Sequence, residues 1–151
     1  MRTWLVALAC AALLPAGAGA QYSVALGAGP TAGVVGLEVL WPAAGRRAAV
    51  AVGGGVAGLG GRGLVYLGAG TPVGRAAARR YASAGYLATP WRFGTIRASG
   101  AVALEGGAQL WPAAGRGLLA DLAAGVVIPH GGTWGGNTVA PSVRLQLGWA
   151  F

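Results

Sequence analysis

Apolar residues alternate with polar or small residues at the end of this chain, and nearly every step keeps the period of two. In the last ten letters, SVRLQLGWAF, the apolar set is Val143, Leu145, Leu147, Trp149 and Phe151. Successive side chains of a β-strand point to opposite faces, so one face of this segment is wholly apolar. Although 55% of the residues are hydrophobic, no long apolar run follows the first twenty. The pattern predicts an all-β protein and excludes a transmembrane helix, which needs about 20 apolar residues in a row.

The first twenty residues have the pattern of an export signal. A positively charged start precedes an apolar stretch from Trp4 to Leu14 and the small-residue sequence AGAGA. Signal peptidase accepts small side chains, so cleavage is expected after Ala20. Residues 1–20 are therefore predicted to be a cleaved signal peptide, and residues 21–151 to form one domain. The single cysteine leaves with the signal, so neither disulfides nor thiol chemistry is expected afterwards.

The segment from Val143 to Phe151 resembles the carboxy-terminal signature of bacterial outer-membrane β-barrel proteins. In that signature, alternating apolar residues lead to a terminal Phe, which the barrel-assembly machinery recognises. Together with the export signal, the resemblance implies an integral protein of the outer membrane in a Gram-negative-type envelope. Its implied partners are outer-membrane lipid and the barrel-assembly machinery. The alternative is a soluble exported β-protein in which the last strand is an edge strand.

Weaker alternation marks further strands, as is usual in membrane barrels. The series predicts a closed, antiparallel, up-and-down transmembrane β-barrel of eight strands, with outer loops at 30–32, 58–62, 99–100 and 129–137. Residues 72–90 fit poorly and are expected to form a short surface helix, with a strand at 79–88 as the alternative. The helix is favoured because an even number of strands must separate two turns on the same side. The predicted strands are 21–29, 32–41, 46–57, 63–71, 91–98, 101–111, 116–128 and 138–151.

The sequence LWPAAGR occurs twice, at 40–46 and at 110–116. Pro fixes its own backbone angle and Gly permits left-handed angles, so PAAG is expected to end one strand and begin the next. The residues around the two copies favour a half-barrel repeat, 21–90 and 91–151. The two copies disagree on the face that carries Trp, which leaves either a β-bulge or a Trp placed at the turn itself.

Tryptophan is enriched where membrane hydrocarbon meets water, because its ring is apolar but its N–H needs a partner. With both chain ends on the periplasmic side, four tryptophans fall near that side and one falls in an outer loop. Core tryptophans of a soluble domain are the alternative. The predicted interfacial girdle is Trp41, Trp91, Trp111, Trp134 and Trp149.

Several polar residues lie on the strand faces opposite to the apolar sets. The interior of an eight-stranded barrel is just wide enough to be filled by side chains. Unpaired charges are costly there, so arginines and carboxylates are expected to pair. We expect this set to plug the barrel rather than to line a polar path. The predicted lumen residues are Glu38, Arg97, Glu105, Gln109, Asp121 and Arg144.

The sequence offers little for catalysis or metal binding. His130 is the only histidine, and its loop contains neither Ser nor carboxylate, whereas a nucleophile needs a base placed beside it. Some small outer-membrane barrels are lipid-modifying enzymes with a His near the outer rim, which keeps that activity as an alternative. One His and three scattered acidic residues are too few to predict a metal site. No catalytic residue, cofactor or metal is predicted.

The chain is strongly basic, with a net charge of +8 at pH 7. Such a charge is often a sign of nucleic-acid binding, but these arginines are scattered and the chain is predicted to be exported. Nucleic acid is therefore not expected as a partner. The predicted function is a structural or envelope-interaction role without enzymatic activity. A minor, anion-leaning, porin-like pore is the other alternative, because arginines outnumber acidic residues.

Overall fold

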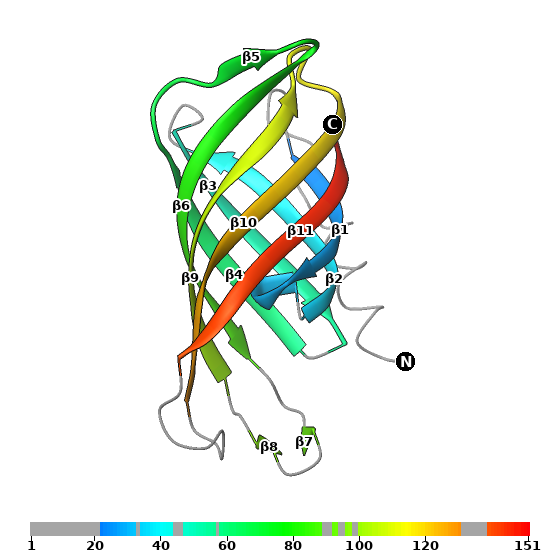
Figure 1. Ribbon diagram of the computed structural model, residues 1–151. Coiled ribbons are helices and arrows are strands. Elements are labelled where there is room, and N and C mark those ends of the chain that lie inside the picture. The colour runs from blue at the N-terminus through cyan, green and yellow to red at the C-terminus, as the bar shows by residue number, and fades with distance from the viewer. Residues whose placement is uncertain are drawn as a thin grey trace.

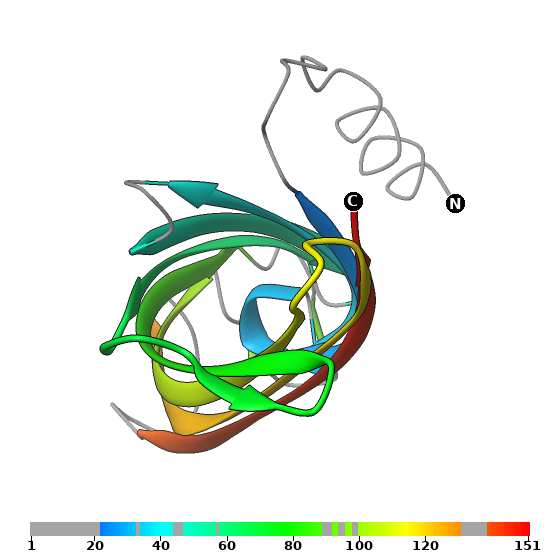
Figure 2. The ribbon, with the colours of Figure 1, turned by 90° about the horizontal axis from the view of Figure 1, so that it is seen from above.

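The computed structural model describes residues 22–32, 34–43, 47–56, 58–88, 92–93, 96–97, 100–130 and 139–151. In this part of the chain, eight antiparallel strands close into an up-and-down β-barrel, as Figures 1 and 2 show. The prediction of such a barrel is confirmed. Its strands are β1 (Ser23–Gly29), β2 (Val34–Ala43), β3 (Ala48–Gly55), β4 (Gly58–Tyr66), β6 (Ala76–Ala88), β9 (Gly100–Pro112), β10 (Gly117–His130) and β11 (Ala140–Ala150).

The first and last strands close the ring. Ser23 of β1 lies opposite Ala150 of β11, and the N–H of Phe151 donates to the carbonyl of Tyr22 at 2.9 Å. Each barrel strand thus pairs on both sides, which removes the open edges that a flat sheet would leave. We call the end of the barrel near Tyr22 and Phe151 the terminal end, which is the upper end in Figure 1, and the opposite end the loop end.

The segment 72–90 does not form the predicted surface helix. Most of it belongs to β6, which pairs with β4 along one side and with β9 along the other. Alternate residues of β6, among them Tyr81, Ser83 and Leu87, are buried inside the barrel. The short strand β5 (Thr71–Val73) pairs with the beginning of β6 and extends the sheet at the terminal end.

The segment 91–98 is not a barrel strand, so this prediction is wrong. Within it, β7 (Arg92–Phe93) and β8 (Ile96–Arg97) form a separate two-stranded sheet below the loop end (Figure 1). The barrel thus gains β6 and lacks a strand at 91–98, which leaves the total at the predicted eight. Four strands, β3, β4, β6 and β9, separate the two LWPAAGR turns, and both turns lie at the terminal end.

The tryptophans of the two LWPAAGR copies lie on opposite faces of the barrel wall. The pairing of β9 with β10 is one residue shorter than a copy of the β2–β3 hairpin would give. As a result, Trp41 lies on the outer face, opposite the exposed Val50, whereas Trp111 is 5% exposed and points inward. Both tryptophans lie within strands, so neither stands outside the alternation. In the second turn, Gly115 takes a φ of 78° and its N–H donates to the carbonyl of Pro112 at 3.0 Å.

The connection between β1 and β2 turns into the barrel instead of forming the expected outer loop. The 3-10 turn η1 (Pro30–Ala32) leaves Thr31 and Ala32 fully buried. Figure 2 shows this segment within the ring of strands when the barrel is seen from above. Within the described ranges, no helix is long and apolar enough to cross a membrane.

The barrel carries large apolar side chains on its outer surface. Every one of the eight strands contributes at least one large hydrophobic residue that is exposed by 37% or more. The inner faces hold charged and polar residues together with small residues and a few large ones such as Leu64 and Trp111. An ordinary water-soluble domain does not combine buried charged residues with so many exposed apolar ones. Outward residues include Leu26, Val35, Val50, Val52, Leu59, Val65, Tyr86, Val102, Leu104, Leu118, Leu122 and Leu145.

Candidate functional site

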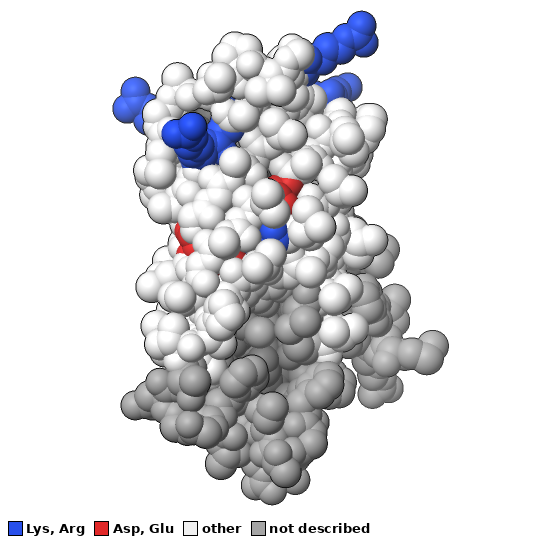
Figure 3. Space-filling model, in the orientation of Figure 1, with Lys and Arg blue, Asp and Glu red and all other residues white. Residues whose placement is uncertain are grey.

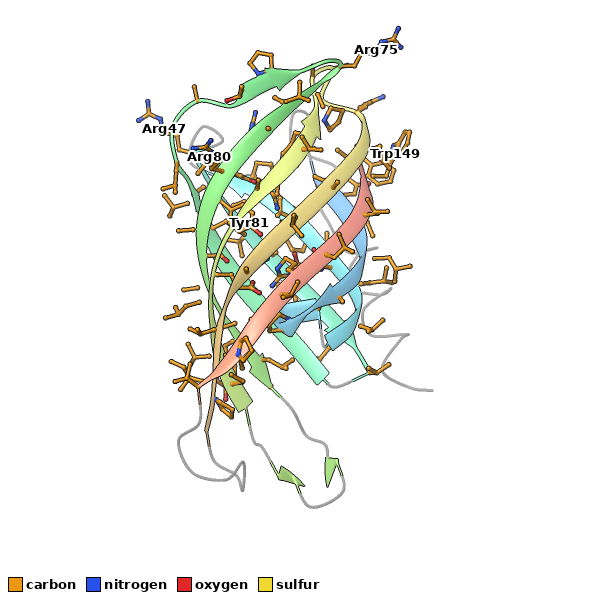
Figure 4. The ribbon with its side chains drawn as sticks, in the orientation of Figure 1. Arg47, Arg75, Arg80, Tyr81 and Trp149 are labelled. Atoms are coloured by element: carbon orange, nitrogen blue, oxygen red, sulfur yellow. The ribbon has the colours of Figure 1, made fainter. Side chains whose placement is uncertain are left out.

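The interior of the barrel holds a connected cluster of polar side chains, which we call the lumen network. Its charged members come from five strands, so that no single hairpin could build it. Each of them is at most 5% exposed, and Arg144 is the largest fully buried side chain of the described residues. Tyr81, labelled in Figure 4, also belongs to this network, and its side chain is 1% exposed. The charged members are Glu38, Arg62, Glu105, Asp121 and Arg144.

Arg62 of β4 bridges two carboxylates. Its Nη2 lies 2.7 Å from Glu38 Oε1 and 2.6 Å from Asp121 Oδ2. Its Nε donates to Glu38 Oε1 at 3.1 Å, and its Nη1 donates to the Tyr81 hydroxyl at 3.0 Å. That hydroxyl in turn donates to Asp121 Oδ1 at 2.6 Å. All three guanidinium nitrogens therefore have partners, which is the condition for burying an arginine without a large net cost.

Arg144 of β11 bridges a second pair of carboxylates. Its Nη1 lies 3.0 Å from Glu38 Oε2, and its Nη2 lies 2.6 Å from Glu105 Oε2. Nη2 also donates to Thr31 Oγ1 at 2.8 Å, and Thr31 donates onward to Glu38 at 3.0 Å. Ser142 donates to the other oxygen of Glu105 at 2.8 Å. Glu38 thus links the two arginines. Thr31 connects the inturned turn η1 to both Glu38 and Arg144.

A neutral arm continues the network toward the terminal end. Gln109 Nε2 donates to Asp121 Oδ2 at 3.0 Å, while its Oε1 accepts from the Tyr66 hydroxyl at 2.7 Å and from Trp111 Nε1 at 3.1 Å. The guanidinium carbon of Arg79 lies 5.7 Å from the ring centre of Tyr66 and 5.9 Å from that of Trp111. Both distances fall within the cation–π range.

The charges of the network are nearly balanced. Two guanidinium groups meet three carboxylates, and their side chains are 0–2% exposed. Burying ions in this way costs several kcal/mol per ion unless attraction and further hydrogen bonds offset the cost. Here the hydroxyls and amides around the ions provide those bonds. In the described interior, Ser23 Oγ and Gln146 Nε2 are the buried side-chain atoms left without a partner.

Glycines make room for the inturned turn. A Cβ added to Gly60 would lie 2.8 Å from Thr31 Cα, and one added to Gly53 would lie 2.8 Å from the Thr31 carbonyl oxygen. A Cβ on Gly85 would meet Thr31 Cγ2 at 2.6 Å. Real Cβ atoms do not approach other atoms so closely, so three neighbouring strands need glycine where they contact Thr31. The abundant glycine of this chain therefore has a specific use at the loop end of the lumen.

Five of the six residues predicted to face the lumen lie in the network. The sixth, Arg97, is part of β8 outside the barrel, and its side chain lies outside the described part of the structure. Sequence reasoning missed Arg62, because residues 58–62 were expected to form an outer loop instead of the first half of β4. Its signal was the alternation of Arg62, Leu64 and Tyr66, all of which are buried. The five placed residues are Glu38, Glu105, Gln109, Asp121 and Arg144.

The predicted girdle is only partly compatible with the structure. Trp149 is 52% exposed on the outer face, and Trp41 is half-buried on that face. The prediction for Trp111 is wrong, because its ring lies inside the barrel and its Nε1–H donates a hydrogen bond to Gln109. Trp91 and Trp134 lie outside the described residues. Sequence reasoning did not find the stacked rings of Tyr22 and Phe151, whose centres are 5.0 Å apart at the terminal end.

The residues of the proposed assembly signal share the outer face of the last strand and the position after it. They are exposed by 45–66%, whereas the alternate residues Ser142, Arg144 and Gln146 are buried. The exposed set is Val143, Leu145, Leu147, Trp149 and Phe151.

Among the described residues, no group of three or more His, Cys, Asp or Glu side chains is arranged to hold a metal ion. His130 is the last residue of β10, and its side chain lies beyond what the structure describes. Comparisons with protein families, with curated proteins and with solved structures find no match for this chain. Its function has to be inferred from the geometry of the barrel itself.

Proposed function

We propose that this protein is an integral β-barrel of the outer membrane, with a structural or envelope-interaction role and no enzymatic activity. The observation that carries the proposal is the reversed polarity of the barrel. Arg144 of β11 is fully buried in the lumen, while its neighbours Val143 and Leu145 on the opposite face of the same strand are exposed by 66% and 58%. In water, such a surface would leave large apolar areas unburied. In a bilayer, lipid chains would cover it, and the closed ring would leave no backbone edge unpaired.

The predicted export signal and the terminal Phe151 support the same proposal. A cleaved signal at residues 1–20 would deliver the chain across the inner membrane. The alternating segment that ends at Phe151 would then be recognised by the barrel-assembly machinery, as its resemblance to outer-membrane barrels implies. Outer-membrane lipid would be the main partner. The buried ion pairs of the lumen network favour a static role over transport of solutes.

Membrane insertion can be tested on the purified protein. We expect it to partition into detergent-extracted membranes and to fold into phospholipid vesicles. On a denaturing gel, the unboiled sample should migrate differently from the boiled one, because a closed membrane barrel resists detergent until it is heated. A protein that stays in the aqueous fraction and shows no such difference would contradict the proposal.

The positions of two tryptophans give a sharper test. Two variants would each keep one tryptophan, Trp149 or Trp111, with Phe at the other tryptophan positions. Brominated lipids quench only rings that they contact, so we expect strong quenching of Trp149 and weak quenching of Trp111. Equal quenching of both would contradict the inward position of Trp111, and no quenching of either would contradict insertion.

The lumen network also predicts how the protein behaves in a planar bilayer. Arg62 and Arg144 are held by carboxylates inside a barrel that side chains can fill. We therefore expect no stepwise ion conductance from the folded protein. A larger porin-type barrel measured in the same bilayer is the positive control. Reproducible channels from the unmodified protein would instead support the pore alternative.

A further inference from the structure

Four arginine side chains stand out from the barrel at its terminal end. Arg47 follows the β2–β3 turn, Arg75 lies in the turn between β5 and β6, Arg80 is on β6, and Arg116 is in the β9–β10 turn. All four are exposed, and Figure 4 labels three of them at the upper end of the molecule. Figure 3 likewise shows the protruding blue side chains at this end. We call these four residues the arginine collar.

The collar extends from the β2–β3 turn to the β9–β10 turn rather than forming one patch. The terminal end has three turns, β2–β3, β4–β6 and β9–β10, and each of them carries or adjoins at least one collar arginine. The fourth position, where β1 meets β11, carries the stacked rings of Tyr22 and Phe151 instead. Charges at three of the four positions around a cylinder fit a surface that extends around the barrel, such as a leaflet of lipid headgroups. A rigid partner would need the charges on one side.

No acidic side chain competes with the collar. The sequence contains only three acidic residues, and all three are buried in the lumen network, at 1–5% exposure. The exposed collar arginines therefore lack an acidic side chain as a partner. The acidic residues are Glu38, Glu105 and Asp121.

The collar borders the apolar outer surface directly. Arg80 points outward from β6, and its carbonyl accepts from the N–H of Leu67, which is 58% exposed. Two residues after Arg116, Leu118 is 65% exposed. An arginine in such a place can lay its aliphatic stem along apolar surface while the guanidinium reaches the polar boundary. There it can bind phosphate through two parallel N–H bonds, which lysine cannot do.

We propose that the arginine collar binds the phosphate groups of anionic phospholipids in the leaflet around the terminal end of the barrel. This inference rests on the proposed membrane location and adds a lipid class to it. A basic residue near an anionic membrane surface strengthens attraction by about fivefold, so several of them together should give a clear preference over zwitterionic lipid. The collar would thereby fix the depth of the barrel in the bilayer and enrich anionic lipid around it.

The test measures which lipids contact the folded protein. The full chain is reconstituted into vesicles of phosphatidylcholine and phosphatidylglycerol, and spin-labelled forms of the two lipids report their relative association by electron paramagnetic resonance. We expect phosphatidylglycerol to be preferred by about fivefold at low salt and clearly less in 0.5 M NaCl, where the Debye length falls to a few ångströms. Absence of any preference at low salt would overturn the inference.

A matched pair of variants locates the effect. Arg80→Gln together with Arg116→Gln removes two of the four collar charges, and should clearly lower the preference for phosphatidylglycerol. Arg92→Gln together with Arg97→Gln removes two charges from β7 and β8 beyond the loop end, and should leave the preference unchanged. Substitutions of the exposed Arg80 and Arg116 should cost little stability, and the salt dependence of the unmodified protein provides a second measurement. Equal losses in both variants would overturn the inference.

Failure of this inference can be told apart from failure of the membrane proposal. If the protein inserts into phosphatidylcholine vesicles but shows no lipid preference, only the proposed lipid binding by the arginine collar is overturned. A protein that inserts into neither vesicle would overturn both.

Discussion

Replacing Arg144 with Met should destabilise the barrel by about 3–5 kcal/mol, because removing one partner of a buried ion pair leaves an uncompensated charge in a low-dielectric interior. Arg144 is fully buried and holds Glu38 at 3.0 Å and Glu105 at 2.6 Å. Met fills a similar volume but offers neither charge nor donors. The measurement is the free energy of unfolding in urea, with the barrel in vesicles or micelles and unfolding followed by fluorescence.

The sequence offers a matched control for this substitution. Arg116→Met removes the same side chain from an exposed turn, and in zwitterionic vesicles or micelles should change stability by no more than about 0.5 kcal/mol. Combining Arg144→Met with Glu105→Gln should restore part of the loss, because it removes the carboxylate that has lost its partner. If Arg144→Met were no more destabilising than Arg116→Met, the lumen network would not contribute to stability as described.

Replacing Gly60 with Val should displace the inturned turn η1 and cost stability near the upper end of about 1–3 kcal/mol, the range for overpacking. The first added carbon would lie 2.8 Å from Thr31 Cα and 3.0 Å from the Tyr86 carbonyl oxygen. Both are backbone positions that cannot rotate away. A shift of Thr31 would also disturb its bonds to Glu38 and Arg144. Chemical unfolding gives the loss, and protease sensitivity of the η1 segment reports its displacement.

Gly63 of the same strand is the control for Gly60. A Cβ on Gly63 meets nothing within 4 Å, and the residue is exposed on the outer face. Gly63→Ala should therefore be neutral or stabilising by about 0.4–1 kcal/mol, since alanine restricts the unfolded chain. Should Gly60→Val and Gly63→Ala behave alike, glycine in β4 would reflect general strand flexibility and not the seat of η1.

The sequence allowed the long, strongly patterned strands to be predicted well. In β11, large apolar residues alternate with Arg144, Gln146 and Ser142, so the period of two is visible without any knowledge of neighbours. The inward facing of Glu38 and Asp121 could be read from the same alternation. These features are local, because each depends only on the order of residues within one strand.

The errors arise where facing or structure depends on distant parts of the chain. β6 begins with AAARR, and alanine and arginine favour a helix locally. It is a strand because β4 and β9 pair with it on both sides, and propensity cannot report such partners. Trp111 faces inward because its hairpin is one residue shorter than its counterpart, and a slip of one residue exchanges the two faces of a strand. Arg62 was missed because the glycines before it resemble a turn more than a strand.

The lumen network has a consequence for how the protein acquires its structure. Its bonds join residues that are far apart in the chain: 106 residues separate Arg144 from Glu38, and 59 separate Asp121 from Arg62. Contacts of such long range form only after the intervening chain has been ordered. A partly assembled ring would hold ions without counterions, so every intermediate short of closure is penalised. Folding should therefore be all-or-none. Once β11 pairs with β1, opening the ring again would expose the buried ions and is costly.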